Sequence, residues 1–458
     1  MAEHWIDGTD GSNSNDGLSA GAPKKDFVPG LSMDDDTCVI NLKRGTTISL
    51  TTGAFRPTAR CIIRPYGDGS ARAKLVQDST NVLQHTGESG SFEFDPGLHL
   101  VGTTGTFANS LTAALYVNDV WIEGFQNSVR VGTNGGRVSH CRLWDMTNNG
   151  ILGGQTSSGA ANGLEALHNH IDATGAASDP ISFHDGTGSG YGGVIGWNIC
   201  IGGGDNGIGV EEQYFGILVI GNEIYAPTES GIALSGSGCK LIGNYIHGCG
   251  HAGINSGSDG GGHFMTGNVM YDCGRVADSM GLLVAGSVPF YFYNNTLVAG
   301  PNSTAARLIQ LGAGTSGYVK NNILATKDGT NFRYVQVVDA DVTGFQFSNN
   351  LYYGYTGTNA FTINNGSPRS WAQWQALTAL DGGTQDDDSM EGVDPGLDSH
   401  CRITNASPAY QAGTYIAKVK DQCGRKLRRT PDIGAYQYSA RRSAVGTNRS
   451  AALRAYVG

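Results

Sequence analysis

The sequence predicts an all-β chain in which short parallel strands wind into one long solenoid, a parallel β-helix with a cap at each end. Three observations carry this prediction: a repeated phrase centred on Asn, short strand-like runs without helical periodicity, and abundant glycine for tight corners. Glycine supplies 70 of the 458 residues, and charged residues make up only 15%. A chain of this length ordinarily divides into several domains unless it grows by adding repeats.

The repeated phrase is an Asn followed by a short apolar run, and it returns at nearly constant spacing. The marked asparagines are Asn169, Asn198, Asn222, Asn244, Asn268, Asn295, Asn322 and Asn350. Their successive spacings are 29, 24, 22, 24, 27, 27 and 28 residues, within the period range of solenoid proteins. Looser copies precede them at 119–122 and 140–143.

Each copy contains short β-rich runs with alternating polarity, and Gly or Asn where the chain must turn a corner. Parallel strands without intervening helices can close only by winding, which stacks successive coils about 4.8 Å apart. Asparagines that share one corner can then hydrogen-bond to the amides above and below and to turn backbone. We therefore expect an asparagine ladder along the solenoid.

Segments at both ends of the chain are similar to those of a known family. Trp5–Ser19 resembles its entry segment and Cys61–Gly67 its first coil. The family's closing segment is similar to five parts of this chain: Ser407–Gly413, Asp421, Gly424, Arg425 and Asp432–Tyr436. The family is that of right-handed parallel β-helix, pectate-lyase-like proteins, which includes polysaccharide lyases, glycoside hydrolases and phage tailspikes. The resemblance implies a right-handed coil but assigns no catalytic residue, because this fold hosts many chemistries.

We expect four segments along the chain. They are an N-terminal entry segment and cap (1–60), the β-helix coils (61–354), a closing segment (355–438) and a basic tail (439–458). The closing segment is predicted to contain one short helix, because Ser370–Gln373 has the capping-box pattern. Trp371, Trp374 and Leu377 would fall on one face of this helix, against the side or end of the solenoid.

Charge is distributed unevenly along the chain. Residues 402–458 carry eleven Lys or Arg against two acids, whereas the stretch between Leu143 and Cys239 has ten acids and no Lys or Arg. Such an acidic surface repels polyanions, so nucleic acid is not expected as a partner. The basic tail is expected to contact a neighbouring chain or another virion protein.

Targeting and cysteine patterns suggest synthesis in a reducing cytoplasm. The N-terminus has no basic start followed by an apolar core, so no signal peptide is expected, and no apolar run is long enough to span a membrane. The nine cysteines form no CxxC pair and no recognisable disulfide framework.

Candidate catalytic residues come from aligning the strand that follows each Gly-rich turn. The alignment places His184 beside Glu211 and Asp185 beside Glu212. Neighbouring carboxylates shift each other's pKa, the condition under which one acts as acid and the other as base or nucleophile in a glycosidase. Two alternatives stay open: solvated acids at a strand end, or Ca²⁺ ligands from Asp185, Glu211 and Glu212. No other metal or cofactor is expected.

A candidate substrate-binding column lies three residues after each marked Asn. Tyr225, His247 and Tyr271 occupy successive copies and would form an outward strip of rings suited to the apolar faces of sugars. The alternative is an aromatic ladder that stabilises the sheet. Both roles can hold together.

The favoured function is that of a tailspike-like virion protein that binds a bacterial surface polysaccharide, with cleavage of it left open. Resemblance to tailspikes implies a homotrimer with the long axes side by side. A hydrolase is favoured over a lyase, because the central coils lack the cations that a uronate lyase commonly uses. The alternatives are a non-catalytic structural or adhesive virion protein, and a free, extracellular bacterial polysaccharide lyase or hydrolase.

Overall fold

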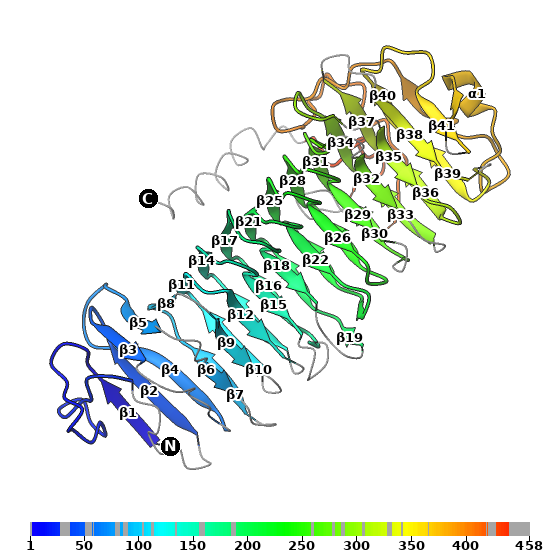
Figure 1. Ribbon diagram of the computed structural model, residues 1–458. Helices are drawn as coiled ribbons and strands as arrows, with labels where there is room; N and C mark the ends of the chain where they lie inside the picture. The colour runs from blue at the N-terminus through cyan, green and yellow to red at the C-terminus, as the bar shows by residue number, and fades with distance from the viewer. Residues whose placement is uncertain are drawn as a thin grey trace.

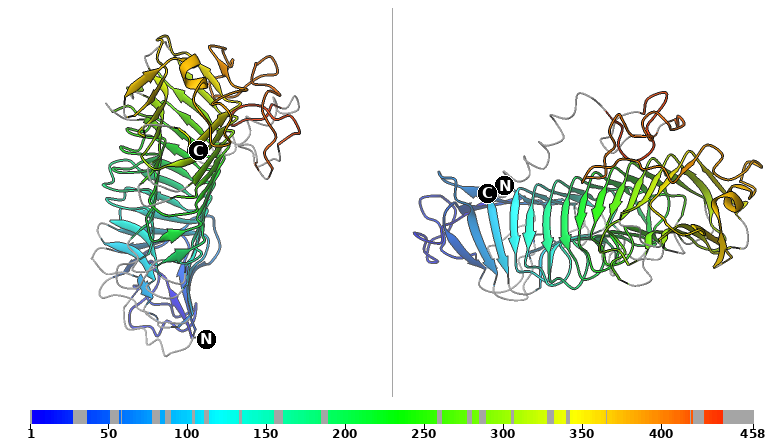
Figure 2. Two further views of the ribbon diagram at one scale, coloured as in Figure 1. Left: turned by 90° about the vertical axis from the view of Figure 1, so that its right-hand side faces the viewer. Right: turned by 90° about the horizontal axis from the view of Figure 1, so that it is seen from above.

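Figure 1 shows the computed structural model, a long stack of coils with the N-terminus near one end. The structure describes residues 2–27, 37–50, 57, 59–77, 83–85, 90–102, 105–110, 114–132, 135–154, 161–184, 189–257, 261–276, 280–284, 289–304, 307–327, 332–339, 342–364, 366–417, 419 and 427–438. Within these residues the strands form three long sheets, which we call A, B and C, that run along the stack (Figure 2).

Sheet A holds fourteen described strands in the order of the chain. They are β1 (Ala2–Ile6), β2 (Cys38–Lys43), β4 (Cys61–Tyr66), β7 (Ser91–Phe94), β10 (Ala114–Asn118), β13 (Gly136–Ser139), β16 (Glu165–Leu167), β20 (Val194–Gly196), β24 (Leu218–Ile220), β27 (Lys240–Ile242), β30 (Phe264–Thr266), β33 (Pro289–Tyr293), β36 (Ser316–Lys320) and β39 (Phe345–Ser348). In the segment expected to be an entry cap, β2 pairs directly with β4, Cys38 opposite Cys61.

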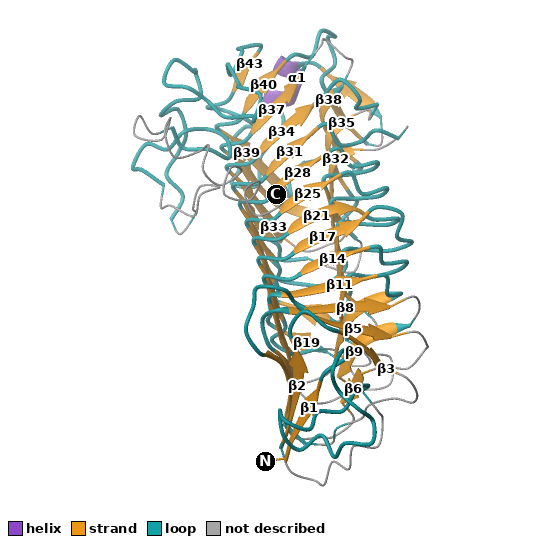
Figure 3. Cartoon of the chain, turned by 90° about the vertical axis from the view of Figure 1, so that its left-hand side faces the viewer, coloured by secondary structure: helices purple, strands orange, loops and turns teal. Residues whose placement is uncertain are grey.

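Sheet B also holds fourteen described strands. They are β3 (Thr47–Leu50), β5 (Ala73–Gln77), β8 (Leu98–Gly102), β11 (Val120–Glu123), β14 (Arg142–Trp144), β17 (His170–Ala173), β21 (Ile199–Gly202), β25 (Glu223–Tyr225), β28 (Tyr245–His247), β31 (Val269–Tyr271), β34 (Thr296–Ala299), β37 (Ile323–Thr326), β40 (Leu351–Tyr353) and β43 (Met390–Glu391). Figure 3 views the stack from the side on which most of these strands are labelled.

Sheet C holds thirteen described strands, parallel except for the final pair, β41 with β42. They are β6 (Leu83–His85), β9 (Thr106–Ser110), β12 (Asn127–Val131), β15 (Ile151–Gly153), β18 (Ile181–Phe183), β22 (Ile208–Val210), β26 (Ile232–Leu234), β29 (Ile254–Ser256), β32 (Met280–Val284), β35 (Arg307–Leu311), β38 (Arg333–Val337), β41 (Phe361–Ile363) and β42 (Ser367–Arg369). A small sheet pairs β19 (Gly190–Tyr191) with β23 (Tyr214–Phe215).

One coil passes through A, then B, then C, before the chain returns to A in the next coil. The A-to-B corner is two residues long: in the coil of β16 and β17, His168 takes φ 56° and Asn169 follows it. Left-handed backbone of this kind suits Gly, and Gly221 occupies the same corner two coils later with φ 65°. The predicted winding of parallel strands is therefore confirmed.

The asparagine ladder predicted from the repeat is confirmed along all eight marked residues. Each Asn donates its Nδ2 to the Oδ1 of the next one at 2.9–3.1 Å, from Asn169 to Asn350. Each Oδ1 also accepts the preceding coil's backbone N–H; Cys141 is the first such donor, to Asn169 at 3.0 Å. The buried corner thus satisfies its polar groups by stacking alone.

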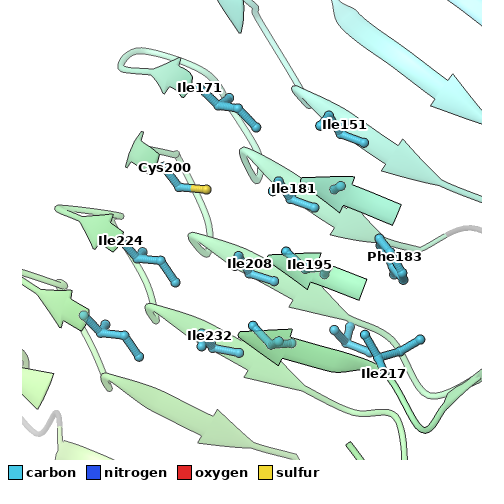
Figure 4. Packing of buried hydrophobic residues seen from close by; sticks show 14 of the residues in the cluster. Ile151, Ile171, Ile181, Phe183, Ile195, Cys200, Ile208, Ile217, Ile224 and Ile232 are labelled. Carbon is cyan, nitrogen blue, oxygen red and sulfur yellow. The ribbon is translucent and has the colours of Figure 1, made fainter. Parts of the chain in front are cut away.

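The interior is filled by one apolar column from each sheet. Ile151, Ile181, Ile208 and Ile232 repeat along sheet C, and Ile171, Cys200 and Ile224 along sheet B, all pointing into the coil (Figure 4). All seven side chains are fully buried. Burial of each such side chain contributes about 1.5–3 kcal/mol, so the repeat itself supplies the core. The eight cysteines in the described residues are buried free thiols.

The closing segment folds as predicted around one helix, α1 (Trp371–Gln375), with Ser370 as its N-cap in a capping box. Trp374 is buried and stacks on Phe361 of β41, with ring centroids 4.7 Å apart. Farther on, the chain crosses the outer face of the last strands of sheet B. There Ile403, Ala409, Ile433 and Ala435 pack in one cluster with residues of β31, β34, β37 and β40. No helix in the described part of the chain is both long and apolar enough to cross a membrane.

Candidate functional site

The outer face of sheet C between β18 and β29 is the candidate active site. In β18, Ile181 and Phe183 point into the core, so Ser182 between them faces outward. Its partners along the sheet are Gly209, Ala233 and Asn255, in that order. Ser182 and Gly209 are buried, whereas Ala233 and Asn255 are half-buried.

His184 and Glu211 are neighbours, as the sequence alignment predicted. Phe183 pairs with Val210, and the Glu211 N–H donates to the Phe183 carbonyl at 2.9 Å, so His184 and Glu211 leave the sheet from adjacent coils. Both side chains are half-buried, and Glu212 is exposed. Asp185 lies outside the described residues, so its predicted place beside Glu212 stays a prediction.

Asp179 completes this face, although sequence reasoning did not select it. It belongs to the turn before β18, and its Oδ1 accepts the Asn206 N–H from the next coil at 2.7 Å. Its other carboxylate oxygen lies over Gly209, where any Cβ would collide with it. Gly209 is therefore the residue that makes room for the carboxyl on the outer face.

Burial raises the pKa of Asp179 to about 7, with the negative charge of Asp205 as the next cause and that of Glu211 as a smaller one. The Asn206 N–H and the Ser182 hydroxyl act in the opposite direction by hydrogen-bonding to the carboxylate. The residue is only 5% exposed, in keeping with desolvation as the main cause. The pKa of this carboxyl is therefore raised from the ordinary acidic range to near neutral pH.

Such an arrangement is suited to acid–base chemistry. A carboxyl that holds a proton near pH 7 can donate it, while a charged neighbour acts as base or nucleophile. Asp179 with Glu211 supplies both parts on one face. The raised pKa marks a candidate site because carboxyls with this value are concentrated at functional positions.

A weak signal for Asp179 does exist in the sequence. The turns before four strands of sheet C, β15, β18, β22 and β26, end in a polar residue followed by Gly or Pro: Asn149–Gly150, Asp179–Pro180, Asn206–Gly207 and Ser230–Gly231. Asn206 Oδ1 accepts the Ser230 N–H at 3.3 Å, and Asn127 Oδ1 accepts the Asn149 N–H at 3.3 Å. Asp179 is the acidic member of this second, shorter ladder.

The aromatic column on sheet B has the predicted register, Tyr225 beside His247 and His247 beside Tyr271. The rings of Tyr225 and His247 lie 4.7 Å apart, and Tyr225 is 44% exposed. Tyr271 differs, because it packs against the closing segment and lies under the Lys327 ammonium, 5.0 Å from its ring. The closing segment therefore covers the Tyr271 end of the column, and the Tyr225 and His247 end lies outside the part that it covers.

Binding of Ca²⁺ by Asp185, Glu211 and Glu212 stays a prediction. Among the described residues, no group of three or more His, Cys, Asp or Glu side chains is placed to hold a metal ion. Asp185, one of the three proposed ligands, is not among those residues.

No family model matches the chain. No curated protein matches it either. Similar solved structures include pectate lyase Pel9A, 16% identical over 95% of this chain and 96% of that chain, with a TM-score of 0.36. A GH87 α-1,3-glucanase of Streptomyces thermodiastaticus is 12% identical over 77% of this chain and 64% of that chain, TM-score 0.39.

A tailspike protein of E. coli bacteriophage HK620 is 11% identical, over 75% of this chain and 76% of that chain, with a TM-score of 0.33. The class of fold is set by the chain's own three stacked parallel sheets and its asparagine corner. The chain is a parallel β-helix, the fold that the repeat and the sequence resemblance predicted.

Proposed function

We propose that this protein binds a bacterial surface polysaccharide and hydrolyses its glycosidic bonds on the outer face of sheet C. The observation that carries the proposal is Asp179, a buried carboxyl with a pKa of about 7 beside Asp205 and Glu211. Ala233, half-buried beside Gly209 in the next coil, is proposed to leave room for the sugar chain next to this nearly covered carboxyl.

In the proposed reaction, Asp179 gives its proton to the glycosidic oxygen as the bond from that oxygen to the anomeric carbon breaks. The Glu211 carboxylate either attacks the anomeric carbon or removes a proton from the water that does so. Water supplies the new hydroxyl group, and Asp179 regains a proton before the next cycle. His184 and Glu212 flank Glu211 and are proposed to bind the sugar on either side of the reacting bond.

The test is incubation of purified protein with host polysaccharides, followed by measurement of new reducing ends. Asp179→Asn and Glu211→Gln are each expected to lower the rate at least 100-fold, because each removes one half of the acid–base pair. Asp68→Asn, an exposed acid far along the chain, serves as the control and should retain the rate. Wild-type binding without new reducing ends would favour the non-catalytic adhesive alternative, and a product with ultraviolet absorbance would favour a lyase.

We further propose that the protein works on a virion as a tailspike-like homotrimer. The acidic coils and the basic tail, residues 439–458, support contact between copies or with another virion protein. The tail lies outside the described residues, so its partner is part of the proposal. Light scattering should give three times the chain mass of 47.9 kDa. A monomer would instead favour a free bacterial enzyme.

A further inference from the structure

A second face of the molecule carries a cluster of rings and cations that the proposed reaction does not use. We call it the tryptophan patch and define it as His99, Trp121, Trp144, Arg72 and Arg142. Trp121 pairs with His99 on one side and Arg142 on the other, on the outer face of β8, β11 and β14 (Figure 3). This is sheet B, whereas Asp179 and Glu211 lie on sheet C.

The rings of the patch lie against one another. His99 is 5.8 Å from Trp121 and 5.6 Å from Trp144, and the two indoles are 6.2 Å apart in an edge-to-face arrangement. Trp121 nevertheless remains 38% exposed. Part of this indole is therefore accessible to a ligand, although Arg72 lies over its ring.

The two arginines differ in their partners. Arg72 donates to Asp119 Oδ1 at 2.6 Å and lies 4.5 Å over the Trp121 ring. The exposed Arg142 lies 5.4 Å over the Trp144 ring. Among the described residues it has no ion pair and no side-chain hydrogen bond. Stacking on the indole thus positions a guanidinium whose donors are unpaired, the group that recognises a carboxylate in a bidentate manner.

The charge around the patch is mixed, and Arg142 is the exposed cation at its edge. Arg142 is the last cation before the stretch from Leu143 to Cys239, which has ten acids and no Lys or Arg. Within the patch, the Arg72 guanidinium is paired with Asp119 at 2.6 Å, and the Glu123 carboxylate lies 3.0 Å from His99 Nε2. Arg142 and Lys74, which pairs with His99 in the same outward column, attract an anionic ligand that the acids of the following coils repel. The guanidinium of Arg142 and the aromatic surface therefore meet at one position along the stack.

Aromatic side chains continue from the patch along the neighbouring A-to-B corner. His140, His168 and Trp197 stack in successive coils, with ring centroids 5.0 and 5.2 Å apart, and Trp197 is 39% exposed. All three take φ 56°, a left-handed conformation that costs about 1–2 kcal/mol per residue relative to Gly. These three corner rings extend the aromatic surface along the molecule, even though their backbone conformation is strained.

We propose that the tryptophan patch binds an acidic sugar unit of a glycan, with the sugar's carboxylate on Arg142 and its carbon face against Trp121. The choice of a glycan rests on the proposed function, but the site is separate from the catalytic face. The patch would hold a polysaccharide on the protein independently of cleavage and would select chains that contain carboxylated sugars.

The test measures equilibrium binding of oligosaccharides of alginate, polygalacturonate and hyaluronan, with neutral dextran oligosaccharides as the comparison. We expect at least one acidic probe to bind below about 1 mM, a free energy of about −4 kcal/mol, and dextran not to bind. Added salt should weaken the binding. Trp121→Ala and Arg142→Gln should each weaken it at least 10-fold. Tyr116→Ala, an exposed ring on β10 of sheet A in the same coil, is the matched control and should leave binding unchanged.

The proposal is overturned if no acidic probe binds, if dextran binds as well as the acidic probes, or if both patch variants bind like the wild type. Thermal melting of each variant checks that it is folded. Asp179→Asn separates the two proposals, because it should abolish cleavage and leave probe binding intact. Loss of cleavage alone bears on the catalytic face, and loss of binding alone bears on the patch.

Discussion

Asn350 donates its Nδ2 to Asp386 Oδ1 at 3.0 Å, so the asparagine ladder ends on a carboxylate supplied by the closing segment. The other oxygen of Asp386 accepts the Trp374 indole N–H at 2.7 Å and the Tyr352 hydroxyl at 2.9 Å. Asp386 is fully buried. The last coil and the cap are thereby joined through one side chain, which satisfies donors that an open end would leave to solvent.

Removal of this carboxylate should destabilise the C-terminal end. Asp386→Ala leaves the buried donors of Asn350, Trp374 and Tyr352 without an acceptor, which we expect to cost about 3 kcal/mol or more. The free energy of unfolding in urea measures the effect. Asp388→Ala, an exposed acid two residues along, should change it by less than about 0.5 kcal/mol. Equal stabilities of the two variants would contradict the joining role.

Removal of an asparagine side chain from the middle of the ladder should destabilise the protein about as much as Asp386→Ala. Asn244 donates to Asn268 Oδ1 and the Val219 carbonyl, and its Oδ1 accepts two N–H groups of Asn222. Asn244→Ala removes four hydrogen bonds inside the coil and leaves the Asn222 backbone N–H without this acceptor, so we expect a loss of about 3–5 kcal/mol in urea unfolding. Asn13→Ala, on the exposed entry segment, provides the comparison. A loss below about 1 kcal/mol at Asn244 would show that coil stacking does not depend on the ladder.

The free energy of unfolding should decrease as the pH rises, because of Asp179. Its folded pKa of about 7 lies above the ordinary 3.8, so its contribution is fully present below pH 3.8 and is lost as pH rises to 7. At 1.36 kcal/mol per pKa unit the loss is about 4 kcal/mol. Asp179→Asn removes this ionisation and keeps an acceptor for the Asn206 N–H. The variant should therefore gain stability relative to wild type between pH 4 and 7. A constant difference across that range would refute the assignment.

Filling the space at Gly209 should displace the Asp179 carboxyl. A Cβ at this position collides with Asp179 and lies 3.3 Å from the Ser182 Oγ. We expect Gly209→Ala to lower stability by about 1–3 kcal/mol and to reduce hydrolysis sharply. Gly21→Ala has no heavy atom closer than 3.9 Å to the added Cβ and should do neither. Unchanged hydrolysis in Gly209→Ala would show that Asp179 does not take part in the reaction.

The spacing of the repeated asparagines predicted more of this structure than the amino-acid composition did. Because side chains repeat once per coil, the alignment of His184 with Glu211 and of Tyr225 with His247 followed directly from spacing. The fold and the register along each sheet were thus accessible from sequence. The capping helix was accessible too, because its capping box is a local pattern.

Two features were not accessible from the repeat. Asp179 lies in a turn whose length varies between coils, and its raised pKa comes from burial and from Asp205 and Glu211, which only the folded coil brings near. The cover over Tyr271 comes from the closing segment, more than 100 residues farther along the chain. Contacts between residues so far apart in the chain leave no periodic pattern in the sequence. The repeat therefore predicted the same outward environment for Tyr225, His247 and Tyr271.

The most direct test of the proposed catalytic face is the titration of Asp179 itself. Protein labelled with ¹³C at the aspartate carboxyl carbons can be followed by NMR from pH 3 to 9, with Asp179→Asn identifying the signal. A midpoint near 7 is predicted, falling in Glu211→Gln as one negative charge is removed. A midpoint near 4, unaffected by Glu211→Gln, would contradict the assignment of Asp179 as the proton donor.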